Sequence, residues 1–505
     1  MRPWPVSYVL AAPVAILAVL PLLVLLDLGV GADTLWDPHW LDVLGQSLAL
    51  AGLTVVGSLF LGVPLAVMTA YVRLPLRGLW LPLLAAPLAM PSYIGAFTFY
   101  AAFGPGGEIE QLTGIPTPEL RGLTGAAVVM SLYTFPFVLL TTRASLRGLD
   151  ASVLDAARTL GLSLPQALWR AVLPRVRRGI AAGALLAALY TLSDFGTPAI
   201  MGVDTFTRVI FVEYNAFGLS QAAMLSLHLL VIVGLILFLE SRFGTEQERP
   251  GRTLVVTPGT LSGAGMMGLA VLVFALAVGL PLALFGIWIA RDGLAGFDPM
   301  TAVNSAWAAS LAALGAVLLA LPVAYAALAG PAGRVMDRLT YFGFGVPGIV
   351  MGTALVHLGL RVPVLYQTLF LLVLAYMLRF LPLAVGAVRS TAERVDDNMT
   401  HAARLLGASR WEAFRRVSLP LTLRGVVAGG ALVFLEAMRE LPATLMLRPT
   451  GFDTLATELW RVYEAGYFGR AGVPGLLLVV ISGVALVLMV SGERGLKAGL
   501  AENKG

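Results

Sequence analysis

The chain has 505 residues, of which 58% are hydrophobic and only 12% are charged. A water-soluble protein of this composition would lack the polar surface that it needs, so the composition indicates an integral membrane protein. The formal net charge of +5 does not point to nucleic acid, because the basic residues are concentrated in particular loops between apolar runs. Cysteine is absent, which excludes disulfides and thiolate metal sites.

Twelve apolar runs follow one another along the chain, each long enough to form a helix of roughly 20 residues that crosses a bilayer. The runs lie in residues 8–27, 45–71, 78–102, 122–142, 177–200, 221–240, 262–290, 304–329, 339–360, 365–388, 425–447 and 472–491. Alternating polar and apolar strands, typical of outer-membrane barrels, do not occur. No convincing small-residue cleavage site follows the first run, so we expect it to remain as a span. The expected fold is an all-α polytopic membrane protein.

The distribution of arginine predicts the orientation in the membrane. Seven arginines lie between residues 143 and 178, and seven more lie between residues 389 and 424. Loops rich in arginine stay on the cytoplasmic side. Together with twelve spans, this arrangement predicts that both termini are cytoplasmic.

One stretch of the sequence occurs twice. Residues 155–174, DAARTLGLSLPQALWRAVLP, and residues 401–420, HAARLLGASRWEAFRRVSLP, agree at ten of twenty positions without a gap. The same offset of 246 residues pairs Phe206 with Phe452. Because both copies belong to arginine-rich loops, we expect two parallel six-helix repeats.

Upstream the offset becomes 258 and pairs Ser47 with Ser305, which predicts a longer outer loop around residues 104–121 in the first half. A polar stretch rich in charges, Gly and Pro joins the halves and indicates a cytoplasmic linker. The expected organisation is a first transmembrane helix with its outer loop in 1–42, a first repeat in 43–241 with its cytoplasmic segment in 151–174, a linker in 242–260, a seventh transmembrane helix with its outer loop in 261–303, a second repeat in 304–492 with its cytoplasmic segment in 397–420, and a cytoplasmic tail in 493–505.

The repeated segment carries local signals for two short helices joined by a turn. Gly161 and Gly407 stand where the first helix would end in a left-handed residue. In each copy a Ser-x-x-Gln or Ser-x-x-Glu spacing follows, which is typical of a capping box at the start of a second helix. Amphipathic helices can lie on the inner leaflet, held by anionic lipid. The fixed spacing of an alanine pair and a glycine favours docking of a protein partner instead.

Both copies resemble the cytoplasmic EAA loop of binding-protein-dependent ABC transporter permeases. That loop has Glu-Ala-Ala, three residues, Gly, nine residues, a hydrophobic residue, any residue and Leu-Pro. The docking positions that the resemblance implies are Asp155, Ala156, Ala157, Gly161, His401, Ala402, Ala403 and Gly407. The leading acid is Asp155 in the first copy, whereas His401 replaces it in the second, so the two contacts need not be equal in strength. The resemblance implies a type I ABC importer permease of the bacterial inner membrane, whose loops dock onto ATPase subunits.

The chain lacks the lysine motif that ATP hydrolysis would need. A Walker A loop requires G-x-x-x-x-G-K-[ST], but the only lysines are Lys497 and Lys504, and neither is followed by Ser or Thr. We therefore predict that this chain is not an enzyme and has no cofactor of its own. Two separate ATPase subunits would bind ATP and magnesium. The resemblance also implies an extracytoplasmic solute-binding protein as a partner, beside the lipid bilayer and without nucleic acid.

After each repeated segment the chain re-enters the membrane and reaches an acid at equivalent positions, Asp194 and Glu440. At roughly 1.5 Å per helical residue, both would lie about 27 Å along the span, toward its outer end. Two opposed carboxylates, with Tyr190, would suit a cation that prefers hard oxygen ligands. The alternative is local: Asp194 would cap a broken helix, and Glu440 would pair with Arg439. The four histidines have no paired ligand spacing, so no metal site is predicted.

Residues 193–199 and 439–460, together with the fused two-repeat layout, resemble the ferric-iron permeases among ABC importers. Thiamine permeases share the fused layout, and sulfate, polyamine and phosphonate permeases share the loop, so these substrates are the alternatives. A secondary transporter can also have twelve spans in parallel halves. It would usually carry a charged signature between its second and third spans, where this chain has only YVRLPLRGLW at 71–80.

Overall fold

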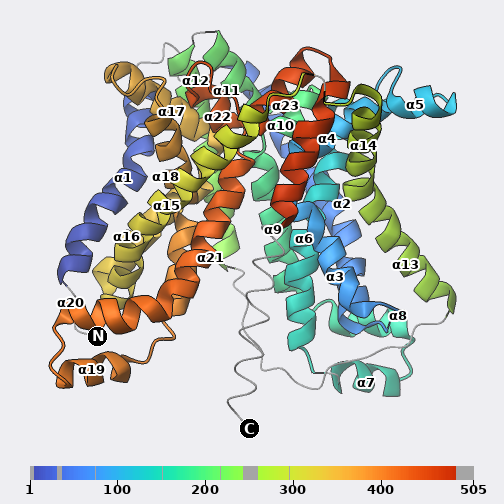
Figure 1. The fold of residues 1–505 in the computed structure, drawn as a ribbon. Coiled ribbons are helices and arrows are strands. Elements are labelled where there is room, and N and C mark those ends of the chain that lie inside the picture. The colour runs from blue at the N-terminus through green and yellow to red at the C-terminus, as the bar shows by residue number, and fades with distance from the viewer. Residues whose placement is uncertain are drawn as a thin grey trace. The chain divides into compact units, whose positions relative to one another are not determined.

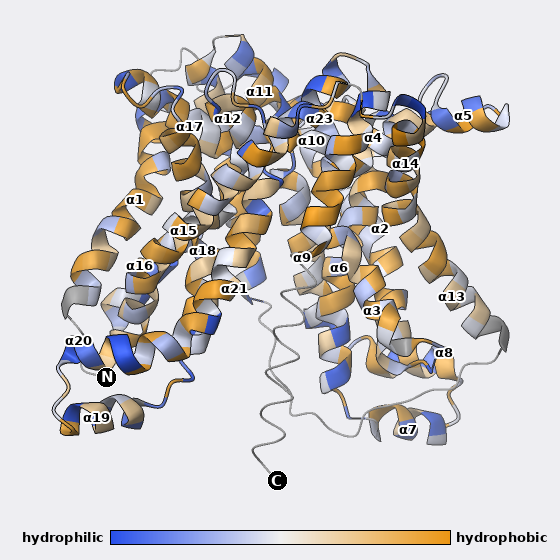
Figure 2. Cartoon of the chain, viewed as in Figure 1, coloured by the Kyte–Doolittle hydropathy of each residue, from blue (hydrophilic) through white to orange (hydrophobic). Residues whose placement is uncertain are grey.

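The computed structural model describes residues 5–30, 37–73, 75–150, 152–216, 218–242, 260–294 and 296–484. All regular elements in these residues are helices, which confirms the expected all-α class. Figure 2 shows hydrophobic residues along the long helices, and hydrophilic residues are frequent in the short helices α7, α19 and α20.

The helices form two compact units, each built from segments that are not contiguous in the sequence. One unit contains Trp36–Val209 and His228–Gly293, and the other contains Met1–Leu35, Ile210–Leu227 and Leu294–Gly505. We call them the first-repeat unit and the second-repeat unit, because most of each comes from that repeat.

The helices of the first-repeat unit (Figure 1) are α2 (His39–Tyr71), α3 (Arg77–Ala85), η1 (Ala86–Ala89), α4 (Ser92–Phe103), α5 (Glu108–Thr113), α6 (Gly122–Gly148), α7 (Ser152–Thr159), α8 (Leu164–Ala167), η2 (Leu168–Val172), α9 (Arg177–Ser193), α10 (Gly196–Met201), α13 (Thr260–Phe274), η3 (Ala275–Gly279) and α14 (Leu280–Asp292). The division between the units falls within α11 (Phe206–Asn215) and α12 (Leu219–Arg242).

The helices of the second-repeat unit are α1 (Pro5–Val30), α15 (Pro299–Ala329), α16 (Pro331–Gly345), α17 (Gly348–Arg361), α18 (Leu369–Ala392), α19 (Asp397–Leu405), α20 (Arg410–Ala413), η4 (Phe414–Ser418), α21 (Leu419–Met438), α22 (Pro442–Leu447), α23 (Leu455–Glu464) and η5 (Phe468–Ala471). The last apolar helix continues from η5 as Phe468–Val484.

Each unit has a core of three packed helices: α2, α6 and α9 in the first-repeat unit, and α15, α18 and α21 in the second-repeat unit. Glycines allow the helices to approach closely. A Cβ on Gly183 would lie 2.6 Å from the Cα of Val138, and a Cβ on Gly429 would lie 3.0 Å from the Cα of Ala384. Both pairs follow the offset of 246 residues, and small residues at such contacts are typical of helix packing in membranes. The geometry therefore confirms that the two halves repeat.

The first and seventh spans are exchanged between the units. Helix α1 packs on α15, α16 and α17, all from the second repeat, while α13 and α14 pack on α2, α3 and α4 of the first. Asp27 of α1 forms an ion pair of 2.7 Å with Arg361 of α17. The sequence did not predict this exchange.

A buried acid holds the exchanged helix α14 at its C-terminal end. Glu108 of α5 accepts hydrogen bonds from Trp288 Nε1 at 2.9 Å and from both terminal nitrogens of Arg291, at 2.9 and 3.0 Å. Its residue is only 8% exposed, whereas the side chain of Arg291 is about half exposed. Deeper in the same unit, Tyr133 donates to the carbonyl of Ala277, which lies in the π-helix η3. We call the contacts of Glu108 the outer latch.

Four of the twelve expected spans are interrupted. Within the described residues, eight helices are long and apolar enough to cross a membrane, and a ninth span is a bent pair, Gly78–Ala89 with Ser92–Phe103, at an angle of 89°. The expected runs 177–200, 339–360 and 425–447 are also helical but contain a break. The broken spans are therefore equivalent in the two repeats. One precedes α6 in the first repeat and α18 in the second, and the other follows the repeated segment.

Proline explains two of these breaks. Pro91 and Pro347 immediately precede α4 and α17, and the residues before them, Met90 and Val346, are extended, with ψ of 133° and 119°. A proline ring disfavours helical backbone in the preceding residue and supplies no N–H to the helix. The other two breaks occur at Asp194 and after Arg439.

Several expectations fall on residues that the structure does not describe. Residues 243–259 of the linker, the tail 493–505 and the end of the last run beyond Val484 lie outside the described residues. The cytoplasmic location of both termini stays a prediction.

Candidate functional site

The first repeated segment has the local structure that its sequence predicts. Helix α7 ends at a turn in which Gly161 has a φ of +86°, in the left-handed region. Helix α8 then starts with a capping box, in which Ser163 N donates to Gln166 Oε1 at 3.1 Å. The expected order of helix, glycine turn and capped helix is confirmed.

The second segment repeats this structure. Gly407 has a φ of +92° after α19, and α20 begins with a capping box between Ser409 and Glu412. Ser409 N donates to Glu412 Oε2 at 2.9 Å, and Glu412 N donates to Ser409 Oγ at 3.2 Å. Each capping box satisfies two backbone donors that the first turn of a helix would otherwise leave without a partner.

The first segment is fastened to the C-terminal ends of α2 and α6. Leu154 and Ala157 are buried in a cluster that includes Tyr71 and Leu146. The hydroxyl of Tyr71 donates to the carbonyl of Leu146 at 2.7 Å, which holds these two helix ends together. Ala157 is only 6% exposed, so the segment's own core explains its small size. In the second copy Ala403 is half-buried.

The remaining predicted docking positions are exposed. Asp155 and Ala156 in the first copy, and His401 and Ala402 in the second, are exposed. The residue directly before each glycine was missing from the predicted docking positions, although it is strongly apolar. Leu160 is 83% exposed and Leu406 is 89% exposed, and they are equivalent at the offset of 246 residues. A large apolar side chain so exposed at the same place in both repeats suggests a surface that a partner covers.

The two segments join their spans differently. In both, a π-helix of five residues follows the capped helix at the same register, Leu168–Val172 in one and Phe414–Ser418 in the other. Such π-turns inside helices are rare and occur frequently at functional sites. The first copy then makes a turn over residues 173–176 before α9, whereas the second runs directly into α21.

Asp194 caps the short helix that follows its break. Its Oδ2 accepts the backbone N–H of Thr197 at 2.9 Å, and its Oδ1 accepts the hydroxyl of Ser92 at 2.6 Å. The local role that the sequence suggested for this residue is therefore present. Tyr190, one turn earlier on α9, lies with its ring centroid 5.7 Å from that of Phe137.

Glu440 has an equivalent position but another partner. It is 6% exposed, and its Oε1 accepts the backbone N–H of Ala443 at 3.2 Å and Nη1 of Arg379 at 2.6 Å. Arg439, the suggested partner, forms its ion pair with Glu436 instead. Asp194 and Glu440 belong to different units, so the expectation that they approach each other stays a prediction.

The loops that lead into α11 and α23 are held by matching side chains in the two repeats. Ser47 Oγ accepts the backbone N–H of Phe206 at 3.0 Å, and Ser305 Oγ accepts that of Leu455 at 2.8 Å. This confirms the pairing of Ser47 with Ser305. The pairing of Phe206 with Phe452 is wrong by three residues, because Leu455 takes the equivalent place.

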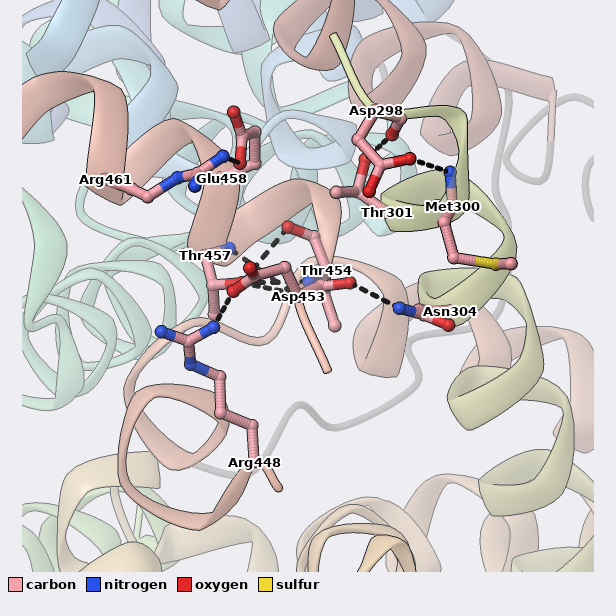
Figure 3. A network of polar contacts seen from close by, with 10 residues as sticks. All are labelled: Asp298, Met300, Thr301, Asn304, Arg448, Asp453, Thr454, Thr457, Glu458 and Arg461. Atoms are coloured by element: carbon pink, nitrogen blue, oxygen red, sulfur yellow. Dashed lines mark hydrogen bonds and ion pairs between the residues drawn. The ribbon is translucent and has the colours of Figure 1, made fainter. Parts of the chain in front are cut away.

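Figure 3 shows the polar contacts around the second of these loops. Asn304 donates to the carbonyl of Asp453 at 3.0 Å, and the carboxylate of Asp453 pairs with Arg448. Glu458, which is buried, pairs with Arg461 on the same helix. The contact of Asn304 ties this loop to α15. Within the described part of the chain, no group of three or more His, Asp or Glu side chains is placed to hold a metal ion.

Comparison with known proteins agrees with this architecture. A family described as the inner membrane component of binding-protein-dependent transport systems matches residues 62–241 and 316–494, one match for each repeat. The chain belongs to this family. The permease is 30% identical over 474 residues, 90% of this chain and 91% of the relative, to the Fe(3+)-transport system permease protein FbpB 2 of Haemophilus influenzae.

Two further relatives show how the match depends on the layout. The probable ABC transporter permease protein y4fN of Sinorhizobium fredii is 26% identical to the permease, with 91% of this chain and 87% of the relative covered. The spermidine/putrescine transport system permease protein PotB of Haemophilus influenzae is 28% identical over 41% of this chain and 76% of its own length. The permease is thus a fused two-repeat transport protein of an ABC importer in the inner membrane, and its relatives are transport permeases.

Proposed function

We propose that this permease carries ferric iron into the cell, after an extracytoplasmic binding protein has delivered the iron to its outer loops. The observation that carries this proposal is the match of 30% identity over nearly the whole length of both chains to a permease named for Fe(3+) transport. The match to the polyamine relative, by comparison, spans only 41% of this chain. The resemblance of residues 193–199 and 439–460 to ferric-iron permeases supports the same substrate.

We infer that two ATPase subunits dock on the two repeated segments. Exposure of Ala156, Ala402, Leu160 and Leu406 supports this, since each copy offers an apolar surface of the same form. The absence of a Walker A lysine from the sequence supports hydrolysis of ATP in those separate subunits. ATP then favours one state of the permease through differential affinity for it. Docking of the ATPase subunits requires both repeated segments to lie on the cytoplasmic side of the membrane.

A role of Asp194 and Tyr190 in cation passage stays part of this proposal, whereas the carboxylate of Glu440 is engaged by Arg379. Carboxylates and a phenol are the oxygen ligands that a hard cation prefers. What supports it is the position of Asp194 at a break in its span, between α9 and α10, one turn after Tyr190. Replacement of Asp194 by Asn should reduce uptake more than it reduces assembly with the ATPase.

Uptake into proteoliposomes tests the substrate. The permease is reconstituted with its ATPase and its binding protein, and radioactive ferric iron, spermidine or thiamine is supplied with ATP inside. We expect accumulation of iron that requires both ATP and the binding protein, and little accumulation of the other two solutes. Accumulation of another solute but not iron would reject the ferric-iron proposal. Accumulation driven by an ion gradient without the ATPase would identify a secondary transporter.

A further inference from the structure

The second-repeat unit places an ion pair where two broken spans meet. Arg379 comes from α18, which is continuous, and Glu440 lies in the break between α21 and α22. Their side chains are 18% and 6% exposed, so both charges are largely removed from water. The pair also lies against Gly348, the first residue of α17, and a Cβ at this glycine would overlap both Arg379 and Glu440. The ion pair thus joins three helices at one point.

The first-repeat unit builds its equivalent point without this pair. Tyr133 occupies the position of Arg379 at the offset of 246 residues, and its hydroxyl is bonded to Ala277. Ser92, the first residue of α4, donates to Asp194. The two acids therefore share the capping contact to the residue three positions later, but they differ in their second partner: a serine hydroxyl in one unit and a guanidinium in the other.

The guanidinium has a physical reason to be there. A charge buried at this depth is costly unless an opposite charge and hydrogen bonds compensate it. Glu440 Oε1 already accepts bonds from Arg379 and from the backbone of Ala443. The nearby charges, Glu436 and Arg439, compensate each other on their own helix. The four charges form two ion pairs, so the network is neutral.

We propose that Arg379 is a positioning residue of the second repeat: it fixes the carboxylate of Glu440, and thereby the angle at which α22 leaves α21. Glu440 acts through this ion pair and not as a ligand of the transported solute. The inference rests on the proposed transport function but not on the identity of the solute. It gives Glu440 a task of its own, because its carboxylate is held by Arg379, whereas the carboxylate of Asp194 accepts the hydroxyl of Ser92.

A double-mutant cycle distinguishes positioning from ligation. The variants are Arg379→Gln, Glu440→Gln and the two combined, each assembled with the ATPase and the binding protein. Either single change leaves a buried charge without its partner, whereas the double change leaves two neutral amides that can bond to each other. We expect each single variant to melt roughly 5–10 °C lower and to lose most of its binding-protein-stimulated ATP hydrolysis. The double variant should recover most of both.

Two further variants keep the test sharp. Arg379→Lys retains the charge and should keep most of the hydrolysis, and Glu436→Gln with Arg439→Gln should have a smaller effect because that pair lies within one helix. If the double variant melts normally but stays as inactive as Glu440→Gln, Glu440 acts on the solute and the proposal is overturned. A Glu440→Gln variant that is fully stable and active would also overturn it. Neither readout depends on the solute being iron, so failure of the ferric-iron proposal is a separate result.

Discussion

At the scale of single residues, the exposed leucines add two positions to the predicted docking surface. The sequence directed attention to the alanine pairs, but Ala157 is buried in the segment's own core, so a large substitution there would damage the fold as well as docking. Leu160 and Leu406 are free of this ambiguity, since most of each side chain is exposed. They are the residues at which docking can be tested without unfolding the permease.

Replacing Leu160 and Leu406 by Ser should weaken the complex with the ATPase. Burial of a leucine contributes about 1.5–3 kcal/mol, which corresponds to roughly tenfold or more in affinity for each site. The melting temperature of the permease should hardly change, because surface substitutions usually alter stability by less than about 0.5 kcal/mol. Co-purification with tagged ATPase measures the loss.

Leu112→Ser is the matched control, because Leu112 is also an exposed leucine but belongs to α5 in the outer loop. It should leave co-purification unchanged. Undiminished co-purification of the Leu160→Ser, Leu406→Ser variant would reject docking through these side chains. It would instead favour the alternative that the segments lie on anionic lipid.

At the scale of elements, the outer latch joins a short loop helix to a transmembrane helix from the other half of the chain. Burial alone would raise the pKa of Glu108, but hydrogen bonds from Arg291 and Trp288 outweigh it, and the pKa lies below its ordinary value. A carboxyl group with a lowered pKa stabilises the fold above its ordinary pKa, and this stabilisation is lost as the pH falls through the folded-state value.

Glu108→Gln should therefore destabilise the permease at neutral pH, by about 1–2 kcal/mol once solvent screening of the half-exposed Arg291 is considered. The difference from the native protein should shrink as the pH falls below the ordinary pKa of a glutamate, about 4.3, and disappear only below the lower folded-state pKa, where the native carboxyl group is also protonated. Melting curves of the native protein and the variant in detergent, at neutral and at acid pH, measure this difference. A difference that stays constant with pH would show that the charge of Glu108 contributes nothing to the latch.

Sequence reasoning succeeded for elements whose cause is local. A glycine in the left-handed region and a serine that caps a helix act on neighbours within four residues, so Gly161, Gly407 and both capping boxes could be predicted from the letters alone. The proline breaks before α4 and α17 have equally local causes, yet hydropathy hides them because both sides of each break are apolar. Partners distant in sequence, such as Arg379 for Glu440, could not be found, since an adjacent Arg439 offered a simpler pairing.

At the scale of the whole molecule, the exchange of α1 and α13–α14 makes each unit depend on both halves of the chain. The apolar runs predicted the helices but not which of them pack together, because an apolar surface carries little information about its partner in a membrane. Neither half of the sequence contains a complete unit.

Cutting the chain between Pro250 and Gly251 tests this dependence. Residues 1–250 and 251–505 expressed separately should fail to accumulate, since each lacks a helix that covers its core. Expressed together, they should assemble and restore ATP-dependent uptake. Accumulation in membranes and uptake by cells expressing one or both fragments provide the measurement. A single fragment that accumulates as a stable monomer would contradict the exchange.

The unequal junctions between the repeated segments and their spans have a mechanical consequence. A push on η4 reaches α21 through uninterrupted helix, which transmits displacement along its axis, whereas the turn at 173–176 lets α9 change direction independently of η2. Two identical ATPase subunits that act on these unlike junctions would displace α9 and α21 by unequal amounts. The second repeat would then move before the first, even though each ATPase subunit hydrolyses the same amount of ATP.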